Sequence, residues 1–192
     1  MDYLKAEVQH RKHELKGFST PTRKVELYST IMERWGYDPL PQYREIPEAP
    51  STKPRLTGDY PYILITGARS PVFYHSELRM IPWLREIQPD PIVEINAQEA
   101  KKLGINEGDW VFIESPRGKV KQRAKLSDKI DPSVVAAQHG WWFPEIKTPD
   151  HGWNKSNINI LTDNDLRNND IAMGATNLRV LMCKIFPAKN ES

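Results

Sequence analysis

The chain has 192 residues and carries 27 lysines and arginines against 25 aspartates and glutamates, so its net charge is only +2. This length suits one domain with an extension, and the near-neutral balance gives no reason to expect nucleic acid as the main partner. The single cysteine excludes an internal disulfide framework and a cysteine-built metal cluster within the chain, and no apolar run reaches the roughly 18 residues that span a membrane.

The first third of the chain has the composition of an arm and a linker. Residues 1–16 are charged and lack an apolar stripe, which is typical of a frayed helix. Ser29 is placed to cap a short helix that runs through Trp35. Residues 38–59 contain five prolines, and proline fixes φ and removes a hydrogen-bond donor. This stretch therefore cannot enter the interior of a sheet, and it is expected to run as an extended linker across a surface.

A regular strand pattern begins at Tyr60. We therefore expect an N-terminal arm and proline-rich linker over residues 1–59 and a β-rich domain over residues 60–192. The strand candidates are short runs rich in β-branched and aromatic residues: Tyr62–Thr66, Ile92–Ile95, Trp110–Glu114, Val120–Leu126, Val134–Gln138 and Val180–Phe186. With one small helix, these strands favour a mainly β fold, a closed barrel interrupted by two long loops.

Local signals support this assignment. Asn96, followed by Glu99 at the reciprocal position of a capping box, predicts a short helix that ends at Gly104. Pro116-Arg117-Gly118 predicts a hairpin between two strands. The second of these strands alternates apolar and basic residues, and its basic face is expected to be solvated. Cys183 lies in an apolar run, which predicts a buried, inert thiol.

The first long loop, Ala68–Pro91, follows a buried strand that ends at Gly67. It is dense in hydrogen-bonding side chains: Arg69, His75, Ser76 and Glu77. Polar side chains on a loop after a rigid strand are a common way to mount a binding site. The same composition also suits a plain surface loop with solvated groups, and composition alone favours the plain loop. The binding interpretation gains support only if distant parts of the chain supply matching groups.

The second long loop, His139–Arg179, begins with His139-Gly140-Trp141-Trp142 and continues through several asparagines. Asparagine offers both a donor and an acceptor, which suits the edge of a heterocycle that carries N–H and carbonyl groups. The two tryptophans could form the wall of a site for a flat ligand or simply cover the end of the barrel, and the covering role is favoured.

Other chemistries find little support in the sequence. The spacing of His75, His139 and His151 matches none of the short metal-binding motifs. Ser70 and Ser76 lack the Gly-x-Ser-x-Gly turn of a serine hydrolase, and no phosphate-binding glycine loop occurs. We therefore expect neither a metal ligand nor a catalytic residue within this chain.

Taken in order, the motifs resemble the C-terminal molybdopterin-dinucleotide-binding domain of the dimethyl sulfoxide reductase family. They are Thr66-Gly67-Ala68-Arg69, His75-Ser76-Glu77, Pro91–Asn96, Leu103-Gly104-Ile105, Glu107-Gly108-Asp109, Pro116-Arg117-Gly118, His139-Gly140-Trp141-Trp142 and Asn157–Thr162. Upstream, Gly17–Tyr28 resembles the segment that leads into that domain. The similarity covers nearly everything from Gly17 to Ala188.

The resemblance implies a six-stranded double-psi β-barrel that helps to bind a bis-molybdopterin guanine dinucleotide cofactor, in which two pyranopterins hold molybdenum or tungsten. By motif position, it implies cofactor contacts at Thr66, Gly67, Arg69, His75, Ser76, Glu77, His139, Gly140, Trp141, Asn157, Asn159, Leu161 and Thr162. The family motif often reads Thr-Gly-Arg, whereas here Ala68 precedes Arg69, so Arg69 either serves one position later or has a different role.

The family's protein ligand to the metal, and its iron–sulfur cysteines where present, lie in regions upstream of this domain. The chain therefore resembles one domain of an oxidoreductase, and the implied partners are the remaining domains or catalytic subunit and, in some enzymes, an iron–sulfur electron-transfer subunit. The alternative is a non-catalytic barrel that binds a protein partner through Trp141, Trp142 and Trp153. A free-standing hydrolase built on His75 and His139 has little support.

Overall fold

The computed structural model describes residues 10–66, 69–170 and 172–188, and it divides the chain into two compact units, Met1–Arg44 and Glu45–Ser192. Residues 10–44, the described part of the first unit, contain two one-turn helices, α1 (Lys12–Lys16) and α2 (Thr30–Arg34). The predicted cap of α2 is present, since the Ser29 side chain accepts a hydrogen bond from the backbone N–H of Met32 at 3.2 Å. Neither helix has a buried residue.

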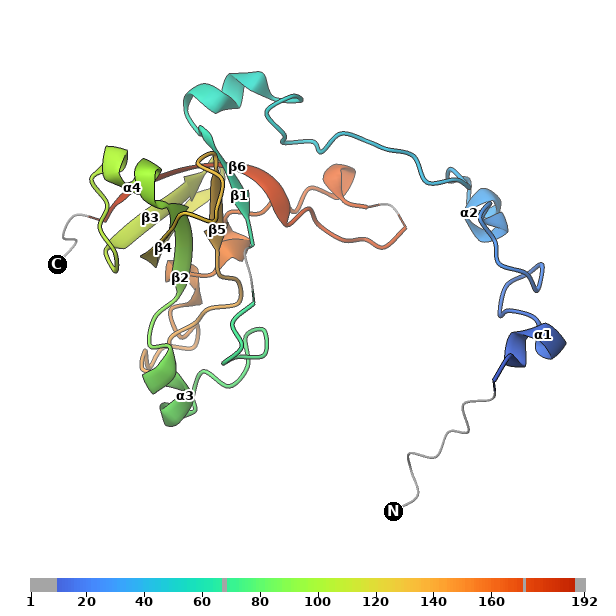
Figure 1. Ribbon diagram of the computed structural model, residues 1–192, viewed down its shortest axis with the longest axis horizontal. Helices are drawn as coiled ribbons and strands as arrows, with labels where there is room; N and C mark the ends of the chain where they lie inside the picture. The colour runs from blue at the N-terminus through green and yellow to red at the C-terminus, as the bar shows by residue number, and fades with distance from the viewer. Residues whose placement is uncertain (1–9, 67–68, 171, 189–192) are drawn as a thin grey trace, which may run out of the picture. The chain divides into compact units, whose positions relative to one another are not determined.

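The second unit is built on a closed six-stranded barrel, shown in Figure 1. Its strands are β1 (Tyr62–Ile65), β2 (Ile92–Asn96), β3 (Trp110–Ser115), β4 (Gly118–Ser127), β5 (Val134–Ala137) and β6 (Arg179–Pro187). They follow one another around the barrel in the order β1-β5-β2-β4-β3-β6. The pairs β1–β5 and β2–β4 are parallel, and the other neighbours are antiparallel. The predicted fold class is confirmed, and all six predicted strands are present.

The barrel interior is filled by side chains that point inward from every second residue along the strands. Leu64, Val111 and Ile113 are completely buried, as the strand period of two requires for one face of a closed sheet. The basic outer face of β4 differs from the prediction because it is not simply solvated. Its Arg123 pairs with Asp90 at 3.0 Å and, like Lys119 and Lys121, lies over an aromatic ring of β3.

Helix α4 (Ala97–Leu103) forms as predicted between Asn96 and Gly104. The Asn96 side chain accepts hydrogen bonds from the backbone N–H groups of Gln98 and Glu99, and Gly104 ends the helix at φ +68°. The reciprocal half of the capping box is not formed, because the Glu99 carboxylate pairs with Lys102 and accepts a hydrogen bond from Tyr62. Cys183 is completely buried as predicted, and burial raises the pKa of its thiol.

The two long segments leave the barrel at the same end. Strands β1 and β5 are parallel neighbours with Ile65 opposite Ala136, so the chain continues from both strands in the same direction, as Figure 1 shows. The first segment contains α3 (Pro82–Ile87), a helix that the sequence analysis missed. Its signal was Pro82 at the first helical turn, followed by Leu84, which packs inward and is 8% exposed.

The second long segment contains three single turns of 3₁₀ helix, η2 (Trp153–Lys155), η3 (Ile158–Ile160) and η4 (Leu166–Asn168), and η1 (Pro54–Gly58) precedes β1. The proline-rich stretch is more than a surface linker, because Glu48 and Ala49 are 5% and 4% exposed within the barrel unit. Among the described residues, the helices are too short or too polar to cross a membrane.

Candidate functional site

The two long segments are joined by one arginine, Arg79, which lies just before α3. Its Nη2 donates to the carbonyl oxygen of His75 at 2.8 Å, and its Nε donates to the carbonyl oxygen of Gly140 at 3.1 Å. A longer contact of 3.4 Å reaches the carbonyl of His139. Arg79 is completely buried. The predicted residues His75, His139 and Gly140 are therefore brought together by a side chain that the sequence analysis did not single out.

Two aromatic rings pack against the guanidinium of this arginine. Its guanidinium carbon lies 4.5 Å from the ring centroid of Phe73 and 4.3 Å from that of Trp141. Trp141 is completely buried in a cluster with Phe73, Leu84 and Phe143, all from the two long segments, and this cluster is separate from the barrel core. Its side chain is closed to both a ligand and a protein partner, and only its backbone remains for a cofactor contact.

Gly140 is required by the close approach of the two segments. Its φ is +68°, a conformation that side chains with a Cβ rarely adopt. A Cβ at this position would lie 3.2 Å from the carbonyl group of His75 and from the backbone nitrogen of Ser76. Trp142 adds a further link, because its Nε1 donates to the carbonyl oxygen of Ser76 at 2.6 Å.

Three of the predicted polar side chains, those of Arg69, His75 and His139, form a group at this junction. A nitrogen of Arg69 lies 2.8 Å from Nε2 of His75, and the rings of His75 and His139 are 5.5 Å apart between centroids. Burial lowers the pKa of His139, and the nearby charges of Arg69, His75 and Arg79 lower it further. In the described part of the chain, the buried Nε2 of His139 has no hydrogen-bond partner. The group is therefore electropositive and has a free position on an imidazole.

The other predicted site residues in and before the first segment are more exposed than the junction. Ser76 and Glu77 are exposed, and Thr66 is half-buried directly after β1. Gly67 lies outside the described residues. Beside Arg69 is a hollow of about 210 Å³. Its lining consists of Arg69, Ser70, Pro71, Gln88, Ile92, Glu94, Lys125, Ala136 and Gln138. That volume is below the roughly 300 Å³ of a typical small-molecule pocket, so this hollow by itself is too small to enclose a drug-sized ligand.

The second set of predicted residues lies around η3. The Asn157 side chain caps this turn by accepting from the backbone N–H of Asn159 at 3.0 Å, and the Thr162 hydroxyl donates to the carbonyl of Asn159 at 3.0 Å. Leu161 is completely buried. The side-chain amide of Asn159 is exposed and bonds to none of the described residues, so it is free for a ligand.

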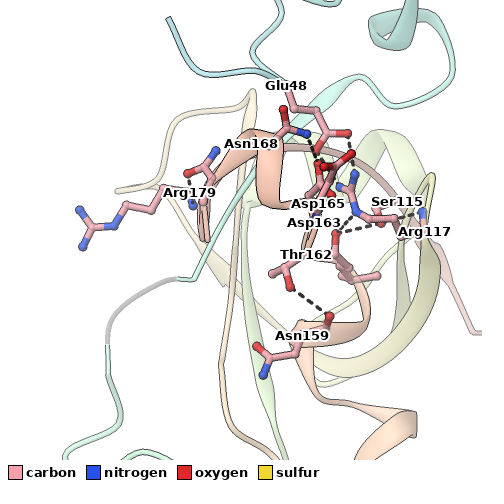
Figure 2. Close-up of polar contacts among 11 residues, drawn as sticks. Glu48, Ser115, Arg117, Asn159, Thr162, Asp163, Asp165, Asn168 and Arg179 are labelled. Carbon is pink, nitrogen blue, oxygen red and sulfur yellow. Dashed lines mark hydrogen bonds and ion pairs between the residues drawn. The ribbon is translucent and has the colours of Figure 1, made fainter. Parts of the chain in front are cut away.

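An ion pair between a buried glutamate and a partly exposed arginine holds this turn against the barrel, as Figure 2 shows. Arg117, in the turn that joins β3 to β4, donates through Nε to the carbonyl oxygen of Leu161 at 2.7 Å. Its other two nitrogens hold both oxygens of Glu48 at 3.0 and 2.7 Å. Since the Glu48 side chain is 6% exposed, the proline-rich stretch orients Arg117, and Arg117 in turn orients η3.

The same turn is packed closely on its apolar side. A Cβ at Gly118 would lie 2.7 Å from Cγ2 of Ile160, so only glycine fits in the turn that faces η3. Beyond η3, hydrogen bonds from the backbone of Asp165 and the side chain of Asn168 lower the pKa of Asp163, and the charge of Arg117 adds to this effect. Figure 2 places these residues beside one another.

Buried amides connect the two sets. Nε2 of Gln122, inside β4, donates to the carbonyl of Gln138 at 2.8 Å and to that of Ser156 at 3.1 Å. The Ser156 hydroxyl donates to the carbonyl of Lys121 at 2.7 Å. One glutamine of the barrel thus holds both the start of the second segment and the approach to η3. Gln122 lies on the face of β4 opposite its basic residues, and the alternating sequence pattern does not reveal these partners.

The family model for the molydopterin dinucleotide binding domain matches residues 62–174, which include β1, the junction and η3. The chain belongs to this family. The matched range includes every residue that the motif resemblance proposed as a cofactor contact.

Similar proteins extend the match beyond this domain. The chain is 42% identical, over 92% of its length, to a dopamine dehydroxylase of Eggerthella lenta, and 34% identical, over 85%, to the acetylene hydratase of Syntrophotalea acetylenica. The dimethyl sulfoxide reductase DmsA of Escherichia coli is 34% identical over 75% of the chain. The predicted resemblance to the dimethyl sulfoxide reductase family is confirmed. The chain spans 17%, 23% and 18% of the lengths of these relatives.

A solved structure supports the same assignment. The acetylene hydratase from Pelobacter acetylenicus superposes with a TM-score of 0.81 at 32% identity, covering 89% of this chain and 24% of that one. The donor chemistry of this molydopterin-binding domain also fits its family's ligand. A pterin presents amide-like edges and the dinucleotide presents phosphate oxygens, and the site offers a guanidinium, an unpaired imidazole nitrogen and a free carboxamide.

Proposed function

We propose that this chain is the part of a larger molybdenum or tungsten oxidoreductase that holds two pterin guanine dinucleotides, while the protein ligand to the metal lies in other domains. The observation that carries the proposal is the junction at Arg79, where Arg69, His75 and His139 from two distant segments form one electropositive group. The small share of each relative that the chain spans agrees with a domain that works as part of a longer enzyme.

The proposed contacts divide by what each residue can offer. Arg69, His139 and Asn159 offer side-chain hydrogen-bonding groups to the ligand, and His75 orients Arg69. Trp141 and Leu161 are buried, so they can contribute only through their backbones. The other proposed contacts are Thr66, Gly67, Ser76, Glu77, Gly140, Asn157 and Thr162.

The bound metal cofactor would supply the redox chemistry, and the residues of this chain would bind and orient it. Hydrogen bonds to a cofactor's periphery tune its electronic properties without any covalent step by the protein. We further propose that residues 60–192 are the cofactor-binding domain and residues 1–59 are its N-terminal arm and linker. The proposed partners are the remaining domains of the enzyme and an iron–sulfur electron-transfer subunit.

The direct test is to purify the complete enzyme that contains this chain and to measure its metal and released pterin. Arg69→Ala and Asn159→Ala should lower the cofactor content severalfold while circular dichroism and unfolding temperature stay unchanged. Arg55→Ala and Asn154→Ala are matched controls, because both are exposed residues outside the proposed site. A wild-type enzyme with neither pterin nor metal would refute the proposal.

The protein-interaction alternative loses its main support in the structure. Trp141 is completely buried and Trp142 is half-buried with its indole N–H bonded to Ser76. Of the three proposed anchors, Trp153 is the exposed one, at 43%. A single exposed tryptophan is ordinary for a protein surface and does not favour this second function.

A further inference from the structure

We propose, on the basis of the function proposed above, that Arg79 is the positioning residue of the cofactor site. By binding the carbonyl oxygens of His75 and Gly140, it sets the spacing of the two segments and leaves unpaired hydrogen-bond donors at their junction. Acceptor oxygens of the cofactor would then meet both segments in one fixed arrangement. Arg79 acts through the backbone of its neighbours and needs no contact with the ligand itself.

The first step of the argument is that Arg79 binds backbone rather than a counter-ion. In the part of the chain that the structure describes, it forms no ion pair with a carboxylate, and its Nη1 has no hydrogen-bond partner. Its hydrogen bonds go to carbonyl oxygens in two segments that the barrel strands separate in the chain. The planar guanidinium can donate in two directions at once, which a lysine ammonium on its flexible stem does less well.

The second step concerns the free-energy cost of burying the charge of Arg79. Burial lowers the pKa of Arg79 to about 10, and the charge of Arg85 contributes, so the side chain stays positive at neutral pH. A buried charge without a counter-ion is unfavourable, and an apolar residue of similar volume would pack against Phe73 and Trp141 at lower cost. Unfavourable local features of this kind concentrate at functional sites.

The third step is what the arrangement leaves free. Arg79 occupies carbonyl oxygens at the junction, whereas the backbone N–H groups of six residues there have no acceptor among the described residues: His75, Ser76, His139, Gly140, Trp141 and Trp142. Gly140, at φ +68°, allows the two backbones to approach this closely. Successive free N–H groups in a turn with a left-handed residue favour anions and other oxygen acceptors.

Arg85 provides a matched control within the same cluster. Its guanidinium carbon also lies over the Trp141 ring, at 5.1 Å, and its Nη1 is also buried and unpaired. Its hydrogen bond differs, because Nη2 donates to the half-exposed carboxylate of Glu145 at 3.1 Å and not to the backbone of either histidine. Replacing Arg85 therefore removes a stacked arginine without releasing the junction.

The experiment uses the complete enzyme with Arg79→Met, Arg79→Ala, Arg79→Lys or Arg85→Met. Arg79→Met keeps the apolar packing and should lower the pterin content at least tenfold. It should also speed hydrogen exchange in residues 72–80 and 139–143, but not in the barrel strands. Millimolar guanidinium should restore a large part of the cofactor content of Arg79→Ala. The cofactor content of Arg79→Lys should stay below that of the guanidinium-rescued Arg79→Ala enzyme. The cofactor content of Arg85→Met should stay within twofold of wild type.

Several results would overturn the proposal. The first is full cofactor content in Arg79→Met with hydrogen exchange unchanged. The second is an equal loss of cofactor in Arg79→Met and Arg85→Met. The third is a loss of cofactor in Arg79→Met that accompanies unfolding of the barrel strands, with no guanidinium rescue in Arg79→Ala. If the wild-type enzyme carries no pterin, the proposed function fails separately. The exchange measurement then still decides the role of Arg79, since unchanged exchange in Arg79→Met would show that it does not hold the segments together.

Discussion

The barrel and the layer of segments at its end are held together in different ways. The barrel is stabilised by completely buried aliphatic side chains such as Leu64 and Ile113 on paired strands. The end layer, residues 69–90, 139–170 and 172–178, depends on arginines and amides that bind backbone carbonyls across long sequence distances. The barrel therefore gives stability, while the end layer gives the geometry of the site.

The largest expected effect is in the barrel. Ile113→Ala removes a completely buried side chain from the core and should lower the free energy of unfolding by about 2–5 kcal/mol. Leu166→Ala is the control, because that side chain is 82% exposed in the end layer and should cost less than about 0.5 kcal/mol. Denaturant unfolding measures both. Equal losses would mean that the barrel is not the source of stability.

The ion pair that fixes η3 should have the next largest effect. Glu48→Gln keeps the shape but removes the charge from the bidentate pair with Arg117, and should cost about 1–3 kcal/mol. Arg167→Gln disrupts the pair between Arg167 and Asp165, in which Arg167 is mostly exposed, and should leave the stability nearly unchanged. Hydrogen exchange should quicken at residues 156–163 in the first variant alone. If both variants behave alike, the proline-rich stretch does not orient η3.

A smaller effect separates two glycines of similar conformation. Gly140 and Gly174 have φ of +68° and +64°, but a Cβ would meet the backbone of His75 only at Gly140, and nothing lies within 4 Å at Gly174. Gly140→Ala should therefore destabilise the protein by about 1 kcal/mol more than Gly174→Ala, since the shared backbone strain cancels and the steric contact remains. Thermal unfolding of the two variants tests this, and equal shifts would contradict close contact at the junction.

The smallest effect is a pH dependence confined to the junction. The folded state lowers the pKa of His139, so the unfolded chain binds a proton more readily. The stabilisation is complete above the unfolded pKa of about 6.5 and is lost as the pH falls through the lower folded value. Protection factors, which correct for the intrinsic slowing of exchange at lower pH, should fall at residues 139–143 as the pH is lowered from 7.5 to 5, and should fall less in His139→Gln. A barrel that loosens equally would contradict the assignment.

Most of the barrel could be predicted from the sequence because its signals are local. Strand patterns such as Trp110–Ser115 alternate between the two faces, and Asn96 and Gly104 mark the ends of α4. The order of the motifs also identified the family. Helix α3 was missed although Pro82 marked its start, because the surrounding polar residues were interpreted as a loop.

The end layer was predictable only in part. Arg69, His75 and His139 could be chosen because polar residues that follow buried strands often form sites. Arg79 gave no such signal, since its partners are carbonyl oxygens, which every residue has. Arg117 was expected only as a turn residue, because its carboxylate partner lies in a proline-rich stretch far away in the sequence. Long-range contacts to backbone leave no periodic pattern to read.

The central claim is that the end layer, fixed by Arg79, holds a pterin dinucleotide. The most direct test is the amount of pterin guanine dinucleotide released per chain from the purified complete enzyme. We predict a near-stoichiometric amount in the wild type and in Arg85→Met, and an amount at least tenfold lower in Arg79→Met. A wild-type enzyme without pterin, or a fully loaded Arg79→Met enzyme, would contradict the account.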